Sequence, residues 1–97
     1  MQHYIIVKWN NEVKDKSVTA NDVRMLYASA ADIVGINKVT IKENVIPRDN
    51  RYDMMIIIDM DASALKAWDD SQLHHRWKEE YGQLINKKAI FDADDDE

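Results

Sequence analysis

The fold is decided by one segment, Tyr52-Asp53-Met54-Met55-Ile56-Ile57-Ile58-Asp59-Met60. Successive side chains of a strand point to opposite faces of its sheet. Residues 54–58 are all apolar, so a strand formed here is apolar on both faces. Strands of that kind lie in the interior of a sheet, with cover on both sides. We therefore predict a central strand over residues 52–60, and the rest of the chain must account for the cover on each face.

Three other segments are predicted to form strands. Residues 4–9 are rich in β-branched and aromatic side chains, and His3 shares a face with their alternate apolar residues. Residues 39–46 form the strand before the central one, and Pro47 with the polar turn that follows ends it. Residues 88–91 form a short closing strand. The sheet therefore has four strands, two before and two after the middle of the chain.

Two segments have the three- and four-residue apolar spacing of an amphipathic helix. Each is preceded by side chains that can cap a helix N-terminus, namely Thr19 or Asn21 for the first helix and Asp61 or Ser63 for the second. Gly35 is placed to end the first helix, because glycine takes left-handed backbone angles without steric cost. Residues 69–71 are predicted to break the second helix, with Ser71 capping its second half.

The resulting order is strand, helix, strand, strand, helix, strand, which is typical of ferredoxin-like α+β folds. We expect a four-stranded antiparallel sheet with both helices on one face, in a single domain over residues 1–92. The acidic residues 93–97 are predicted to be a disordered tail. The second face of the sheet still carries apolar side chains. Its simplest cover is the same face of a second copy, which predicts a homodimer through the open sheet face.

The composition argues against several kinds of partner. A net charge of -5 over 97 residues argues against nucleic acid, whose binding is driven by lysine and arginine. The chain has no cysteine, which removes disulfides, thiolate zinc sites and a cysteine nucleophile and suits a cytoplasmic protein. No signal peptide is visible, and no apolar run reaches the ~18 residues that a membrane span needs. We expect a cytoplasmic protein with neither nucleic acid nor membrane as a partner.

Two histidines are the candidates for chemistry. Histidine takes and gives protons near neutral pH, so His74 on the second helix suits a general acid–base role, assisted by His3. The alternative is that His74 lies at the edge of the core, hydrogen-bonded to backbone or water. A metal triad of these histidines with Asp70 is a further alternative. The three residues form no compact motif, so we predict neither a metal nor a cofactor.

Aromatic residues are the candidates for contact with a small molecule. Tyr27 is on the first helix, where its hydroxyl can turn into a cavity between helices and sheet. Tryptophans in such positions are more often core or interface residues than ligand contacts, and that alternative stays open for both tryptophans of the second helix. The candidate ligand-binding residues are Tyr27, Tyr52, Trp68 and Trp77.

The chain resembles the Dabb family, the stress-responsive dimeric α/β-barrel domains, over nearly its whole length. The features that carry the resemblance occur in the family's order: His3 at the head of a strand that ends in Lys8, Val34-Gly35-Ile36, Tyr52-Asp53, Trp68 with His74 six positions later, and Ala89-Ile90-Phe91-Asp92. The family's helix-two signature is an aromatic residue, two variable positions and His-Pro-x-His. Here Ser71-Gln72-Leu73-His74 replaces the last part, so only the final histidine matches.

The resemblance implies a dimeric barrel with a cavity between the sheet and the helices of each subunit. Plant polyketide cyclases of the family use two histidines in this cavity, and the resemblance matches these histidines to His3 and His74. Three hypotheses follow: a stress-responsive protein that binds a small, largely apolar molecule, an enzyme of the cyclase, isomerase or lyase kind, and a structural or regulatory dimer without a ligand. The last is favoured if Tyr27, Trp68 and Trp77 fill the cavity themselves.

Overall fold

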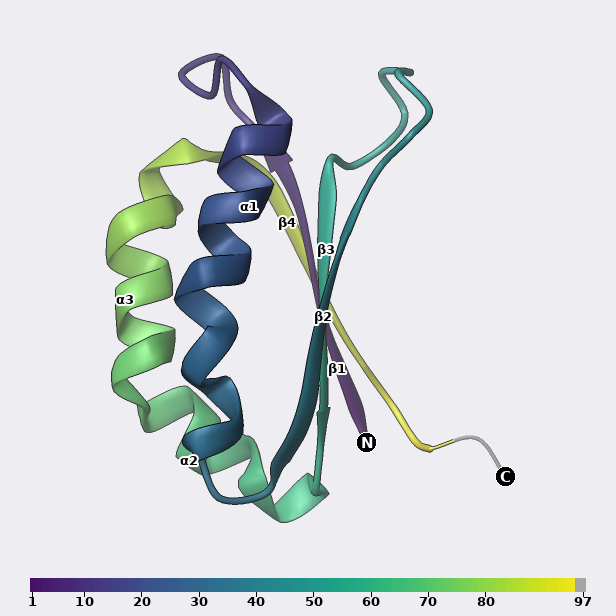
Figure 1. Ribbon diagram of the computed structural model, residues 1–97. Coiled ribbons are helices and arrows are strands. Elements are labelled where there is room, and N and C mark those ends of the chain that lie inside the picture. The colour runs from purple at the N-terminus through teal and green to yellow at the C-terminus, as the bar shows by residue number, and fades with distance from the viewer. Residues whose placement is uncertain (96–97) are drawn as a thin grey trace.

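A four-stranded antiparallel sheet carries all the helices on one of its faces, as the computed structural model shows (Figure 1). The structure describes residues 1–95. The elements in chain order are β1 Gln2–Trp9, α1 Lys16–Leu26, η1 Tyr27–Asp32, β2 Ile36–Glu43, β3 Met54–Met60, η2 Ala62–Ala64, α2 Leu65–Asp70, α3 Gln72–Tyr81, η3 Gly82–Leu84 and β4 Ile85–Ala93, where η marks a 3₁₀ helix. The predicted ferredoxin-like α+β fold is confirmed.

The strand order β2-β3-β1-β4 places β3 inside the sheet, as its apolar run predicts. Its burial alternates: Met54, Ile56 and Ile58 are buried beneath the helices, whereas Met55 and Ile57 are half-buried on the other face. Strand β1 alternates in the same way, with its buried residues on the helix-covered face. We call the opposite face of the sheet the open face.

Several element boundaries differ from the prediction. Helix α1 begins earlier, because the Asp15 carboxylate accepts a hydrogen bond from the backbone N–H of Val18 at 3.0 Å; the predicted caps Thr19 and Asn21 are therefore wrong. Strand β2 spans residues 36–43 rather than 39–46, because Asn44 hydrogen-bonds to the backbone of Ile46 and starts the turn. Strand β4 begins at Ile85, so it is longer than predicted.

The break in the second helical segment lies where the sequence predicts it. Ser71 Oγ donates to the carbonyl of Trp68 at 2.7 Å and accepts from the N–H of His74 at 3.1 Å, so it closes α2 and caps α3. Asp61 occupies the cap position before η2 but makes no capping bond with its side chain. Gly35 has a φ of 91°, and a Cβ there would lie 2.6 Å from the Cβ of Ala64, so both conformation and space require glycine.

The first and the last of the described residues lie together at one end of the sheet (Figure 1). Ala93 belongs to β4, and Asp95 Oδ1 accepts hydrogen bonds from the Met1 amine at 2.7 Å and from Gln2 Nε2 at 3.0 Å. Residues 96–97 of the predicted tail lie outside the described residues. Within residues 1–95, no helix has the length and apolar character that crossing a bilayer requires.

Candidate functional site

The layer between helices and sheet is filled by aromatic side chains. Tyr27 at the start of η1 packs against Trp68 of α2 and Trp77 of α3, with ring centroids 5.6 and 6.0 Å apart. Trp9 of β1 extends the cluster, with its ring 6.4 Å from that of Trp77. All are buried, and Trp68 is 0% exposed. Three of the predicted ligand-binding residues thus meet by packing on one another, which favours the structural or regulatory dimer over a cavity enclosed by this cluster.

This aromatic cluster contains polar atoms that have no partner. The Tyr27 hydroxyl and the indole nitrogens of Trp9 and Trp68 are fully buried, and nothing in residues 1–95 hydrogen-bonds to them. Leaving a buried donor unpaired costs about 1–3 kcal/mol. Burial also raises the pKa of Tyr27, so its hydroxyl stays neutral and able to donate. Such groups are where a water molecule or a ligand atom would gain most from binding.

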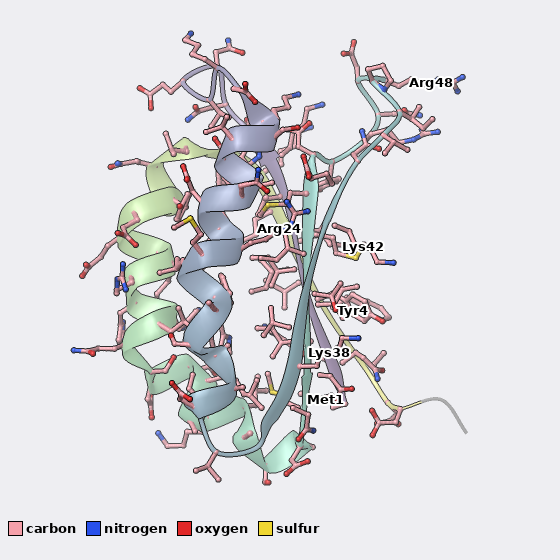
Figure 2. All side chains as sticks on the ribbon, viewed as in Figure 1. Met1, Tyr4, Arg24, Lys38, Lys42 and Arg48 are labelled. Carbon is pink, nitrogen blue, oxygen red and sulfur yellow. The ribbon has the colours of Figure 1, made fainter. Side chains whose placement is uncertain are left out.

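A hollow of about 420 Å³ reaches this cluster from the edge of the sheet, between α1, η1 and β2. Its walls are small or apolar, including Ala30, Val39 and Ile41, and Tyr27 is part of its lining. Arg24 lies at its rim, where the guanidinium donates to the carbonyl of Ile41 and to the Glu43 carboxylate (Figure 2). The 3₁₀ segment that borders the hollow has weaker hydrogen-bond geometry than an α-helix. Tyr27 is therefore the residue of the aromatic cluster that lines this hollow.

His74 lies at the outer side of the aromatic cluster. Its ring packs against Trp68 with centroids 5.1 Å apart, and its Nδ1 is 3.0 Å from the carbonyl of Asp69. A carbonyl only accepts, so Nδ1 carries the proton and Nε2 is left as an acceptor. His74 thus has the backbone hydrogen bond that the edge-of-core interpretation expects, while no hydrogen bond within residues 1–95 uses its Nε2.

His3 has a carboxylate partner that the sequence analysis missed. His3 is 7% exposed, and its Nδ1 lies 2.5 Å from Asp92 Oδ1. The two residues are directly opposed in the pairing of β1 with β4. Within residues 1–95, no hydrogen bond or ring contact joins His3 to His74. The structure therefore gives each histidine its own surroundings.

The metal triad considered from the sequence is not assembled. No group of three metal-ligating side chains occurs in the described part of the chain. Asp70 instead pairs with Lys66, whose Nζ lies 2.6 Å from the carboxylate. The break at Ser71 separates the helix that carries Asp70 from the helix that carries His74. The two side chains therefore do not share one continuous helix face.

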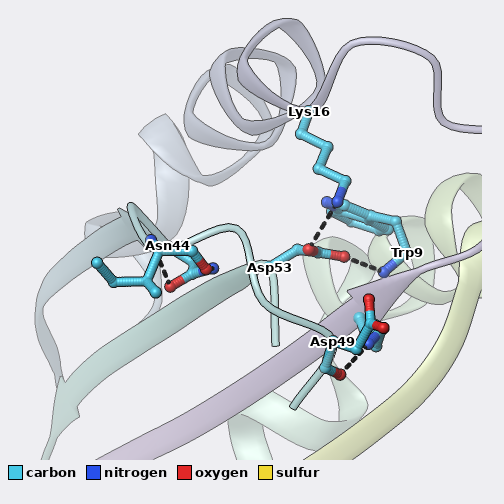
Figure 3. Close-up of polar contacts among 7 residues, drawn as sticks. Trp9, Lys16, Asn44, Asp49 and Asp53 are labelled. Carbon is cyan, nitrogen blue, oxygen red and sulfur yellow. Dashed lines mark hydrogen bonds and ion pairs between the residues drawn. The ribbon is translucent and has the colours of Figure 1, made fainter. Parts of the chain in front are cut away.

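Tyr52 does not join the other predicted ligand contacts. It lies in the loop between β2 and β3, beside a hollow of about 380 Å³ whose lining includes Ile6 and Met55 of the open face. The neighbouring Asp53 is structural: its carboxylate accepts from the backbone N–H of Trp9 at 2.8 Å and from Lys16 Nζ at 2.9 Å (Figure 3). It ties the ends of β1, α1 and β3 together.

The open face presents an apolar stripe. Its half-buried and exposed members are Tyr4, Ile6, Met55, Ile57 and Phe91. Tyr4 and Phe91 are in ring contact at 6.2 Å, and Phe91 is 62% exposed. Figure 2 shows Tyr4 on the side of the sheet away from the helices. Large exposed apolar side chains that gather on one face indicate an interaction surface.

Known proteins match this chain in fold and not in sequence. No family model and no curated protein matches it. A dimeric protein of unknown function with a ferredoxin-like fold from Bacteroides fragilis has a TM-score of 0.76 and 17% identity, over 93% of this chain and 90% of that chain. A Dabb family protein with a ferredoxin-like fold from Mesorhizobium loti has a TM-score of 0.69 and 12% identity, over 93% and 90%.

A third similar structure is the hydroxynitrile lyase from Passiflora edulis, with a TM-score of 0.72 and 9% identity over 93% of this chain and 87% of that chain. Identities this low establish a shared fold and nothing finer. The fold that the Dabb resemblance implies is thereby confirmed, since a Dabb family structure has it. Activity has to be argued from the residues of this chain.

Proposed function

We propose that this protein is a homodimer of the Dabb type that binds a small, largely apolar molecule with one hydrogen-bond acceptor. The observation that carries the proposal is Tyr27, which lines a hollow walled by alanine, valine and isoleucine side chains and whose hydroxyl is buried without a partner within residues 1–95. Apolar walls with a few placed polar groups are typical of small-molecule sites. The ligand's acceptor, such as a carbonyl oxygen, would take the hydroxyl proton as a hydrogen bond.

The homodimer part of the proposal rests on the open face. Its apolar stripe, with Phe91 62% exposed, has no cover from residues 1–95. A domain of this size buries only about 60–65% of its unfolded surface, so a second copy adds apolar burial that one chain lacks. The Bacteroides fragilis protein of the same fold is described as dimeric. A second copy on the open face therefore supplies the missing cover.

The binding site can be tested with acetophenone, a small aromatic ketone, as the probe. Titrating it into the protein while recording methyl resonances should shift Ala30, Val39 and Ile41, which wall the hollow. Tyr27→Phe should abolish these shifts, because it removes only the hydroxyl. Tyr4→Phe makes the same change on the open face and should leave them intact. Shifts confined to the open face, or equal shifts in Tyr27→Phe, would remove the proposed site.

A second candidate function is acid–base catalysis at His3. Asp92 accepts the Nδ1 proton, which leaves Nε2 as the basic nitrogen and stabilises the imidazolium once it forms. A base of this kind could take the hydroxyl proton of a hydroxynitrile, after which the bond to the nitrile carbon breaks and the carbonyl compound forms. The cyanide then takes the proton back from the imidazolium and leaves as hydrogen cyanide, which regenerates the base. The Passiflora edulis lyase of the same fold makes hydroxynitriles the first substrates to try.

The enzyme candidate predicts cyanide release from an aromatic hydroxynitrile above the buffer rate. His3→Gln should abolish it, and Asp92→Asn should lower it and change its pH profile, because the tautomer would no longer be fixed. His74→Gln is the matched control, since no contact joins His74 to His3 within residues 1–95. Release at the buffer rate by the wild-type protein would leave binding as the proposed function. Equal loss in His74→Gln would instead restore the pairing of both histidines suggested by the family.

The stress-responsive and cytoplasmic role remains part of the proposal, and it rests on the Dabb resemblance alone. It predicts that the protein's abundance rises when the source cells are exposed to heat or oxidant. Quantitative immunoblotting of fractionated cells measures both the rise and the compartment. Constant abundance under such stresses would remove this part while leaving ligand binding untouched.

A further inference from the structure

A hollow of about 440 Å³ lies at the end of the sheet where β1 ends and β4 begins. Its lining comes from the end of β1, the connection between β1 and α1, the first residue of α1, the residue that precedes β3 and the start of β4. Figure 1 shows the β1–α1 connection and the start of β4 at the same end of the molecule. None of its lining residues borders the hollow at Tyr27, so we call it the end hollow and treat it as a separate place in the fold.

The side chain of Trp9 is the feature of the end hollow that points to a ligand. Trp9 lines the hollow and is 5% exposed, and its indole nitrogen is buried with no partner in residues 1–95. An indole N–H can only donate a hydrogen bond, so the group that satisfies it must be an acceptor and cannot be a cation. A buried donor left unpaired costs about 1–3 kcal/mol, which a bound acceptor would recover. Trp68 has the same unpartnered nitrogen but lines neither the end hollow nor the hollow at Tyr27, so it provides an internal reference.

Two lysines and one aspartate give the end hollow a surplus of positive charge. Lys16 Nζ lies 2.9 Å from Asp53 Oδ1, and Figure 3 shows the lysine reaching from α1 to that carboxylate. The second carboxylate oxygen accepts from the backbone N–H of Trp9 at 2.8 Å, so both oxygens of Asp53 are already used. Lys8 adds a second positive charge to the lining. A ligand with one negative charge balances the surplus, whereas a dianion would exceed it and be repelled by the Asp53 carboxylate, which is 9% exposed.

Two asparagines supply neutral polar groups to the same hollow. The register of β1 with β4 shifts between Lys8 and Trp9, and Asn86 is the residue of β4 that this irregularity leaves without a Cα partner. Irregularities of this kind re-aim side chains and are frequent beside active sites. No hydrogen bond within residues 1–95 uses the side-chain amide of Asn86 or of Asn11. Both amides can therefore bind a neutral oxygen of a ligand.

We infer that the end hollow binds a small monocarboxylate that carries a neutral oxygen substituent, of which pyruvate is an example. One carboxylate oxygen accepts from the Trp9 indole and the other from Lys16, whose ammonium has donors left after its contact with Asp53. The neutral oxygen pairs with the amide of Asn86. This second site takes an anion, whereas the site proposed at Tyr27 takes a largely apolar molecule, so either site can fail without the other.

Indole N–H resonances test the inference, because each tryptophan gives its own signal. Pyruvate should shift the Trp9 signal, with saturation in the millimolar range expected of a ligand with few atoms. The Trp68 signal should stay in place, since Trp68 does not line the end hollow. Acetone has a methyl group where pyruvate has the carboxylate, and it should shift neither signal.

Substitutions at the lining separate the charge from the neutral contact. Lys16→Met should weaken pyruvate binding about tenfold, because it removes a hydrogen bond to a charged group. Lys14→Met is the matched control, since Lys14 bonds to the carbonyl of Asn11 and does not line the end hollow, and it should leave the affinity unchanged. Asn86→Ala should lower the affinity for pyruvate to that for acetate, which lacks the neutral oxygen.

Each contrary result has a defined meaning. A Trp9 signal that pyruvate does not move would overturn the inference, and so would an equal response to acetone. A larger response to inorganic phosphate would overturn the choice of a monocarboxylate. Shifts that appear instead at Ala30, Val39 and Ile41 would place the anion in the hollow at Tyr27 and overturn the end hollow as a site. Acetophenone binding that fails while pyruvate still shifts Trp9 would overturn the proposed function alone.

Discussion

The two faces of the sheet are both apolar, yet only one is covered within the chain. On the helix-covered face, Ile56 and Ile58 are 0% exposed beneath the aromatic cluster. On the open face, Phe91 is 62% exposed and Ile57 is half-buried. The same strand, β3, supplies residues to both. The difference teaches that the central strand's double-sided pattern encodes two apolar faces, one packed within the chain and one that we propose a second copy covers.

The largest expected effect breaks the covered face. Trp68→Ala should lower the free energy of unfolding by about 3–5 kcal/mol, because it empties a fully buried site that contacts Tyr27 and His74. Denaturant unfolding monitored by circular dichroism measures it. Phe91→Ala removes a ring from the open face and should change the unfolding of the isolated chain far less. Equal losses would mean that both faces are packed within one chain.

The second prediction breaks the open face without touching the core. Ile57→Lys places a charge in the middle of the apolar stripe, opposite Tyr4 and Thr40. Burying an unpaired charge is costly, so the dimer should weaken about a hundredfold while the fold is retained. Sedimentation velocity across a dilution series measures the change. Met25→Lys, at a position 76% exposed on α1, should leave the dimer affinity unchanged.

A third, smaller effect is expected for Asp53, whose carboxylate joins the ends of β1, α1 and β3. Asp53→Asn should destabilise the fold by about 1–2 kcal/mol, because an amide keeps one acceptor and loses the ion pair with Lys16. Thermal unfolding measures it. Lys16→Met removes only the ion pair, whose lysine is 63% exposed, and should cost less. If both variants cost the same, the carboxylate adds nothing to the hydrogen bond with Trp9 beyond what an amide oxygen supplies.

The smallest effect at neutral pH is expected for Tyr27→Phe, which removes an unpaired buried hydroxyl and should raise the free energy of unfolding by about 1 kcal/mol, the lower end of the cost of such a group. Its effect should be visible in alkali. Burial raises the pKa of Tyr27 above its ordinary 10.0. The neutral hydroxyl therefore makes its full contribution to the free energy of unfolding below that pH. The contribution declines as pH rises further, because only the unfolded chain then ionises. Stability should fall with pH less steeply in Tyr27→Phe. Identical slopes would show that the hydroxyl titrates freely in the folded protein.

The sequence predicts those features of the fold that depend on the local pattern of residues. The alternation along β1, the central place of β3 and the break capped by Ser71 all follow from periodicity and side-chain chemistry. The Asp15 cap and the early start of β4 were missed, because polar residues there carry little periodic signal. Element boundaries therefore had to come from the structure.

The candidate site is less predictable, because it depends on register. The partnership of His3 with Asp92 joins residues 89 positions apart and exists only because β1 and β4 pair in one alignment. The sequence signal that pointed to this region was the motif Ala89-Ile90-Phe91-Asp92, of which Asp92 is the last residue. Sequence likewise placed Tyr27 near a cavity, but only packing reveals that its hydroxyl is buried and unpartnered. Neither the His3–Asp92 contact nor the burial of the Tyr27 hydroxyl can be predicted from the spacing of residues along the chain.

Native mass spectrometry of the purified protein tests the central claim most directly. The account predicts ions at twice the 11.3 kDa chain mass with a small-molecule increment, and the same dimer without the increment in Tyr27→Phe. Dimer ions in both proteins with an unchanged increment would contradict the site at Tyr27. Monomer ions, or a wild-type dimer that carries no small molecule, would contradict a ligand-binding homodimer and favour a chain whose aromatic side chains fill its own interior.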